Sequence, residues 1–144
     1  MAMDIGKVHP GVYRQMVRLD EDVAAALNAA ELPGLLVELV RIRVSQINGC
    51  AFCLRLHSRS ALSKGESTDR VAVIGAWWES QYFTDQEQAA LALAEQVTTL
   101  KVPENRAWDN GTLTQEQASA LTWLATAMNA WNRIAISSHY PVAP

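Results

Sequence analysis

Helix start and stop signals recur along this sequence, and they constrain its fold more than any other feature. Residues Thr84–Glu87 and Thr114–Gln117 are capping boxes, in which two side chains satisfy the free N–H groups of a helix start. Lys64-Gly65 is a typical helix stop, and Asn48-Gly49 is a break between helices. No segment shows the apolar alternation of a strand. The sequence therefore predicts an all-α protein.

These signals divide the chain into about six helices within a single domain of residues 1–144. The helices are expected near residues 20–30, 33–45, 50–63, 67–77, 84–99 and 114–137, with a polar loop at 103–111. The second and third helices are expected to form an antiparallel hairpin. Apolar residues of the last helix, from Leu121 to Ile134, cover more than one face. This helix is therefore expected either at the centre of the core or in a contact between subunits.

Cys50 and Cys53, the two cysteines of the chain, are three positions apart, and His57 follows four positions later. On a helix these spacings place all three side chains on one face. The start of the third helix, just after Gly49, favours thiolate over thiol. The pattern predicts a redox-active dithiol at the start of that helix, with an acid/base group beside it.

Three other interpretations of the cysteine pair are weaker. Buried cysteines can simply pack as small apolar side chains. A structural zinc site would need a second pair of ligands, whereas the other histidines, His9 and His139, are isolated near the termini. A structural disulfide would close a loop too short to restrain the unfolded chain much. We therefore expect no bound metal and no cofactor.

Glu38 is an acidic residue within an otherwise apolar helix. In the expected hairpin it lies about nine residues before the turn and His57 about eight after it, so both lie ~12–14 Å from the turn. A carboxylate opposite the imidazole would orient the ring. On pattern alone, a surface ion pair of Glu38 with Arg41 or Arg43 is the alternative.

Two pairs of side chains are weaker candidates for the site. Trp77 and Trp78 would either pack in the core or rim an apolar entrance. Asn129 and Asn132 would either hydrogen-bond across a subunit contact or form a polar helix face.

The segment from Glu38 to Ser58 resembles the signature of the carboxymuconolactone decarboxylase superfamily, in its AhpD-type alkylhydroperoxidase branch. The glutamate, the Cys50-Ala-Phe-Cys53 motif and His57 all match this signature. Further similarities occur at residues 64–66, 77–80, 83–85 and 129–133, so the resemblance covers most of the chain. One difference is Phe52, which stands where the best-studied pattern has a histidine. A proton-relay role at that position is therefore absent.

The resemblance implies an AhpD-like helical bundle and a thiol-dependent alkyl hydroperoxidase that serves antioxidant defence. Cys53 would attack the peroxide and Cys50 would resolve the product, although helix position alone favours Cys50 as the more acidic thiol. His57 would act as general acid/base, and Glu38 would hold it in the required tautomer. Two alternatives are a lactone or decarboxylation enzyme with His57 as base, and a non-enzymatic dithiol redox partner or sensor.

The expected partners are a hydroperoxide, a lipoyl-type or thioredoxin-like dithiol reductant, and other copies of the chain in a trimer or hexamer. Hydrophobic residues make up 49% of the chain, which also favours apolar surface between subunits. A formal net charge of −3 without a basic cluster argues against nucleic acid. No stretch approaches ~18 unbroken apolar residues, so no membrane span is expected. The absence of a signal-peptide pattern and of a disulfide framework favours the cytoplasm.

Overall fold

The structure, a computed structural model, describes residues 3–102 and 107–144, so residues 103–106 of the predicted loop lie outside it. The described residues form helices and connecting segments without a strand, which confirms the all-α prediction. The elements are α1 (Ile5–Val8), α2 (Pro10–Ala29), α3 (Gly34–Asn48), α4 (Ala51–Ser63), α5 (Thr68–Val73), the 3₁₀-helix η1 (Ile74–Glu79), α6 (Asp85–Thr99) and α7 (Gln115–Ser137). None of these helices is long and apolar enough to cross a membrane.

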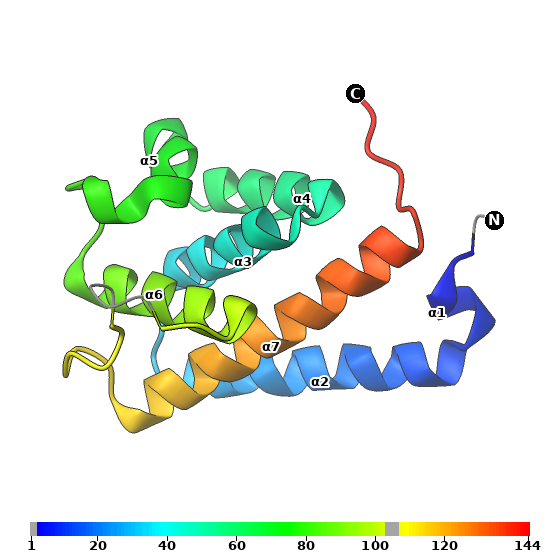
Figure 1. The fold of residues 1–144 in the computed structure, drawn as a ribbon. Helices are drawn as coiled ribbons and strands as arrows, with labels where there is room; N and C mark the ends of the chain where they lie inside the picture. Colours follow the sequence, from blue (N-terminus) through cyan, green and yellow to red (C-terminus); the bar gives the residue numbers. More distant parts are fainter. Residues whose placement is uncertain (1–2, 103–106) are drawn as a thin grey trace.

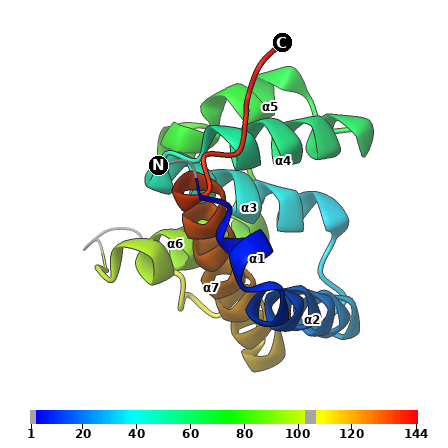
Figure 2. The ribbon, with the colours of Figure 1, turned by 90° about the vertical axis from the view of Figure 1, so that its right-hand side faces the viewer.

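Helix α7 is the central element of the bundle. It crosses the molecule diagonally, with α2 along one side and α3 and α6 along the other (Figure 1). In the perpendicular view the helices follow one another from α4 through α3 and α7 to α2 (Figure 2). Leu121, Leu124 and Met128 of α7 are buried among these neighbours. Much of the wide apolar arc of α7 is thus buried within one chain, whereas Trp123 of the same arc is 52% exposed. A contact between subunits stays a prediction.

Both capping boxes begin a helix, as the sequence predicts. The Thr84 side chain accepts a hydrogen bond from the Glu87 N–H at the start of α6, and the Glu87 carboxylate accepts one from the Thr84 N–H. Thr114 and Gln117 repeat this exchange at the start of α7. Each box satisfies two N–H groups that a helix start leaves without a partner.

The amino-terminal part of the fold differs from the prediction. Pro10 begins α2 ten residues earlier than the expected first helix, and the short α1 precedes it. The first half of α2 carries an apolar stripe, Tyr13, Met16 and Leu19, which is half-buried in the fold, so the sequence held a helical pattern here that the prediction missed. Because of the additional helix, the cysteine motif begins the fourth helix and not the third.

The expected antiparallel hairpin is formed by α3 and α4, which pack side by side (Figure 1). Gly49 ends α3 with a φ angle of 69°, in the left-handed region that glycine enters without a Cβ clash. Cys50 follows as the N-cap of α4, and its sulfur accepts a hydrogen bond of 3.3 Å from the Cys53 N–H. This turn fixes the cysteine motif at the start of α4.

Candidate functional site

Cys50 and Cys53 lie in the first turn of α4 with their sulfur atoms 2.6 Å apart. Both are free thiols, and both are buried. The two positions are held by the backbone of one helical turn, so each sulfur can reach the other without a movement of the chain. The cysteines are therefore close enough to act as a dithiol pair.

The surroundings of Cys53 favour its neutral thiol. Burial, together with the adjacent sulfur of Cys50, raises the pKa of Cys53 from 9.0 to about 12, while a hydrogen bond from the Asn132 side chain acts in the opposite direction. A thiol of this kind needs a nearby proton acceptor before it can react as a nucleophile.

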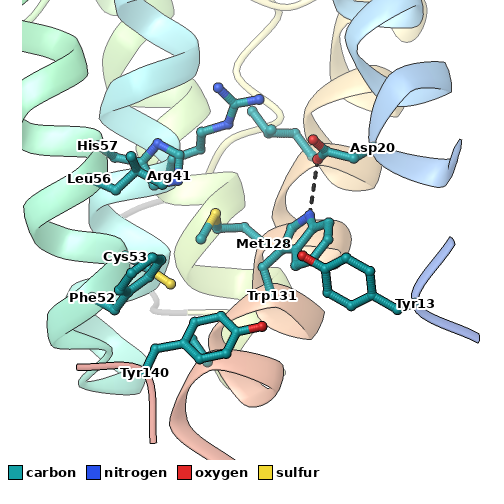
Figure 3. Close-up of a pocket in the computed structure, with 12 residues that line it drawn as sticks. Tyr13, Asp20, Arg41, Phe52, Cys53, Leu56, His57, Met128, Trp131 and Tyr140 are labelled. Atoms are coloured by element: carbon teal, nitrogen blue, oxygen red, sulfur yellow. Dashed lines mark hydrogen bonds between the residues drawn. The ribbon is translucent and has the colours of Figure 1, made fainter. Parts of the chain in front are cut away.

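Cys53 lines a cavity of about 340 Å³, which Cys50 does not line. The Cys53 sulfur points toward the space between Met128 and Tyr140 (Figure 3). Most of the wall is apolar or aromatic, from Tyr13, Phe52, Leu56, Leu124, Met128, Trp131, Ala135 and Tyr140, and the members besides these and Cys53 are Asp20, Arg41 and His57. The cavity can therefore hold an organic molecule against one of the two sulfurs.

His57 faces the same cavity and pairs with Glu38 of α3 across the hairpin. The distance from His57 Nδ1 to Glu38 Oε2 is 3.0 Å. An ionised carboxylate can only accept, so we assign the proton of the neutral ring to Nδ1, which leaves Nε2 as its basic nitrogen. The pair that the sequence predicts is formed, and it presents a base one helical turn from Cys53.

Three further side chains hold the Glu38 carboxylate, which is only 1% exposed. Ser60 Oγ and Lys64 Nζ donate to Oε1 at 2.9 and 2.5 Å, and Arg41 Nη1 lies 3.4 Å from it. Burial alone would raise the pKa of Glu38, but the hydrogen bonds from His57, Lys64 and Ser60 and the Arg41 charge outweigh it and lower the pKa to about 2. Glu38 is therefore ionised at neutral pH.

The alternative ion pairs of Glu38 have a mixed outcome. Arg41 does contact Glu38, but the contact is partly buried and belongs to the His57 cluster. Arg43 contacts Glu95 of α6 instead, with Arg43 Nε 2.9 Å from Glu95 Oε1. The surface ion pair that the pattern allowed is therefore not the role of Glu38 in the fold.

The aromatic wall of the cavity was not predicted, because its members come from distant parts of the sequence. Tyr13 meets Trp131 edge to face where α2 packs on α7, with ring centroids 5.6 Å apart. Phe52 meets Tyr140, from the segment after α7, in the same way at 5.1 Å. Only the tertiary packing brings these rings together, so no local signal reveals them.

Trp77 and Trp78, the two candidates for the rim of an apolar entrance, lie away from the cavity. Trp77 is buried in the core, where its Nε1 donates to Glu95 at 2.9 Å, and Trp78 is 43% exposed. Neither lines the cavity beside Cys53. The core alternative is therefore correct for Trp77.

The structure also gives the positions of the two asparagines and of the histidine near the carboxyl terminus, and it bears on the zinc alternative. Asn129 and Asn132 both bond Asn48 within one chain. His139 is exposed after the end of α7. In the described part of the chain, no three His, Cys, Asp or Glu side chains are grouped so that they could hold a metal ion.

The comparisons with known proteins place this site in a family context. Residues 10–96 match the model of the carboxymuconolactone decarboxylase family. The uncharacterized protein YdfG of Bacillus subtilis (strain 168) is 38% identical over 106 residues, which are 69% of this chain and 71% of that protein. The uncharacterized protein YnjA of Escherichia coli (strain K12) is 28% identical over 94 residues, or 65% and 52% of the two chains.

A solved structure extends the similarity over the whole fold. It is the crystal structure of a protein of unknown function from Agrobacterium tumefaciens, described as a candidate antioxidant defence protein AhpD. The two structures have a TM-score of 0.85 and 27% sequence identity, and each chain is covered to 99%. The segments before residue 10 and after residue 96 therefore belong to the shared architecture.

Proposed function

Because the chain belongs to the carboxymuconolactone decarboxylase family, in its AhpD-type branch, we propose that it is a thiol-dependent alkyl hydroperoxidase. The observation that carries this proposal is the close dithiol of Cys50 and Cys53, whose second member shares a cavity with the base His57. The proposed role is antioxidant, in keeping with the description of the Agrobacterium protein.

In the first step His57 Nε2 takes the proton of the Cys53 thiol, and the sulfur attacks the terminal oxygen of a hydroperoxide. An S–O bond forms while the O–O bond breaks, and Cys53 becomes a sulfenic acid. His57 returns the proton to the leaving alkoxide, which departs as an alcohol. The apolar and aromatic wall of the cavity would hold the organic group of the peroxide.

In the second step the Cys50 sulfur attacks the sulfur of the sulfenic acid. The S–S bond forms, the S–O bond breaks, and hydroxide leaves as water with the Cys50 proton. An external dithiol then reduces the disulfide by exchange and becomes a disulfide itself. Lipoyl-type and thioredoxin-like dithiols are the proposed donors, and a homo-oligomer is the proposed assembly.

Glu38 supports this chemistry from the neighbouring helix. It is ionised, and the hydrogen bond that it accepts from Nδ1 keeps His57 Nε2 available as the base. The negative charge also stabilises the imidazolium that forms when His57 takes the Cys53 proton. The raised pKa of Cys53 makes this base necessary, because little thiolate would form at neutral pH without it.

The test compares the wild-type protein with Cys53→Ser and Cys50→Ser, with cumene hydroperoxide as oxidant and dihydrolipoamide as reductant. Cys53→Ser is expected to remove turnover and sulfenic acid formation. Cys50→Ser is expected to form one sulfenic acid per chain, which dimedone traps, without turnover. A sulfenic acid on Cys50 in the Cys53→Ser protein would reverse the assigned order of the cysteines.

Two outcomes would replace the proposal with one of the alternatives. Activity on a lactone that survives replacement of both cysteines would indicate a decarboxylase-type enzyme with His57 as base. Disulfide formation in mild oxidant, with no measurable consumption of peroxide, would indicate a redox partner or sensor.

A further inference from the structure

Tyr140 is a hydrogen-bonding side chain in the wall of the cavity beside Cys53, and the proposed mechanism gives it no role so far. It lines the cavity together with Cys53, and its ring meets that of Phe52, the residue directly before Cys53. In Figure 3 the hydroxyl of Tyr140 points away from Phe52 into the cavity. The ring alone would serve for packing, so the hydroxyl is the feature that a function has to explain.

The segment that carries Tyr140 is held in place, although it follows the end of α7. The Tyr140 N–H donates to the Ala135 carbonyl of α7 at 3.1 Å. The chain then runs past the start of α4 (Figures 1 and 2). There Arg55 donates from Nη1 to the Ala143 carbonyl at 2.6 Å and from Nη2 to the Pro141 carbonyl at 3.4 Å. Contacts with two helices therefore fix the position of the phenol.

The cavity wall offers few hydrogen-bond donors to a bound molecule. The Trp131 indole already donates to Asp20, with 3.2 Å between Nε1 and Oδ1. Arg41 contacts Glu38 and lies toward the end of the cavity away from Cys53 (Figure 3). The hydroxyls of Tyr13 and Tyr140 remain near the sulfur. A hydrogen bond between these two hydroxyls would use only one of their two protons, so at least one O–H is left for a molecule in the cavity.

The reaction needs a donor that faces the sulfur across the cavity. When the sulfur attacks the terminal oxygen of a hydroperoxide, the oxygen that leaves lies on the far side of the O–O bond, and negative charge develops on it. The Cys53 sulfur points toward the space beside Tyr140 (Figure 3). Tyr13 packs instead on Trp131, on the α2 side of the cavity. The position of Tyr140 therefore fits the leaving oxygen better than that of Tyr13.

We propose that Tyr140 is a further catalytic residue, whose hydroxyl donates a hydrogen bond to the leaving oxygen of the hydroperoxide. This inference rests on the proposed function and deepens it. The S–O bond forms and the O–O bond breaks as before, and Tyr140 keeps its own proton while His57 supplies the proton of the alcohol. Burial raises the pKa of Tyr140, which keeps the phenol protonated at neutral pH and available as a donor.

The experiment compares two reactions of the same sulfur in a Cys50→Ser protein that has no other thiol. The first is oxidation of Cys53 by cumene hydroperoxide, followed by dimedone trapping of the sulfenic acid. The second is alkylation of Cys53 by iodoacetamide, in which no oxygen leaves. Tyr140→Phe, which keeps the ring contact with Phe52, is expected to slow oxidation about tenfold, because a hydrogen bond to a charged group is lost. It is expected to leave alkylation unchanged.

Two further tyrosine variants show whether the effect belongs to this hydroxyl. Tyr82→Phe is the matched control, because Tyr82 is 51% exposed and does not line the cavity, and it should change neither rate. Tyr13→Phe removes the other cavity hydroxyl and should slow oxidation less than Tyr140→Phe does. A loss in Tyr13→Phe as large as that in Tyr140→Phe would overturn the assignment.

The ratio of the two rates separates a catalytic role from a structural one. If Tyr140 only shaped the cavity or the access to Cys53, oxidation and alkylation would change together, and that result would overturn the proposal. Equally fast oxidation of the Tyr140→Phe and Tyr140-containing proteins would overturn this inference and keep the peroxidase function. A protein that is alkylated but not oxidised, with Tyr140 in place, would reject the peroxidase function and this inference with it.

Discussion

Glu38 and Glu95 are two buried carboxylates that meet arginines of the same helix, and their surroundings differ in an instructive way. They are 1% and 5% exposed. Glu38 contacts Arg41, and Glu95 contacts Arg43 two residues further along α3. By burial and charge alone the two sites look alike, because each is a carboxylate enclosed in the bundle with a cation beside it.

The difference lies in what else each carboxylate holds and where it faces. Glu38 bonds His57, which can gain and lose a proton near neutral pH and which lines the cavity beside Cys53. Glu95 bonds the Trp77 indole, a donor that does not titrate, and neither residue lines that cavity. A buried ion pair is therefore weak evidence of a functional site until a proton carrier and access accompany it.

The largest expected effect is on the rate of peroxide reduction. Glu38→Gln should slow the reaction about 10²-fold, because the amide loses the charge that sustains the protonated His57. Glu95→Gln should leave the rate of the folded protein unchanged, since that carboxylate does not line the cavity beside Cys53. Steady-state assays at saturating reductant measure both. Equal rate losses in the two variants would mean that the contrast between Glu38 and Glu95 does not distinguish a functional carboxylate from a structural one.

Both substitutions should lower the free energy of unfolding, whereas only Glu38→Gln should lower the rate. Each change leaves an arginine without its buried anionic partner, and breaking such a pair costs about 3–5 kcal/mol. Urea unfolding of both variants should show losses of this order. A variant that lost rate only in proportion to its unfolded fraction would count against a specific role for Glu38.

Acid pH sharpens the comparison because the pKa of Glu38 is lowered from 4.5 to about 2 in the folded state. A carboxyl group with a lowered folded pKa adds stability above its unfolded pKa and loses it as the pH falls through the folded value. The contribution of Glu38, about 3 kcal/mol, should therefore fade between pH 4.5 and 2. The stability difference between wild type and Glu38→Gln should narrow over this range. A constant difference would show that Glu38 is not the titrating group.

The sequence predicted local structure well where one turn or one helix face decides it. The capping boxes, the glycine turn before Cys50 and the approach of Glu38 to His57 all follow from spacing along a hairpin. Each depends on residues in the same or adjacent helices, so the fixed rise and periodicity of the helix carry the information.

The rest of the site depends on packing between distant segments. The rings of Tyr13 and Tyr140 are more than a hundred residues apart in the chain, yet both line the cavity. Asn132 was expected at a subunit contact or on a polar face, whereas it bonds Asn48 and Ser45 inside one chain. A polar residue in an amphipathic helix looks the same in the sequence whether water or a buried amide satisfies it.

The smallest expected effect concerns Lys64, which gives Glu38 its shortest described contact, 2.5 Å from Nζ to Oε1. Its side chain is 45% exposed, so water and salt screen the pair, and such contacts are worth about 1 kcal/mol or less. Lys64→Met, which keeps the apolar stem, should lower the rate less than about fivefold. Lys7→Met on the exposed α1 is the matched control and should change nothing. The contrary result would be a Lys64→Met protein that is slowed as much as Glu38→Gln. In that case the exposed lysine, and not the buried His57, would keep Glu38 ionised. The difference between Glu38 and Glu95 would then come from the solvent-exposed partner of Glu38.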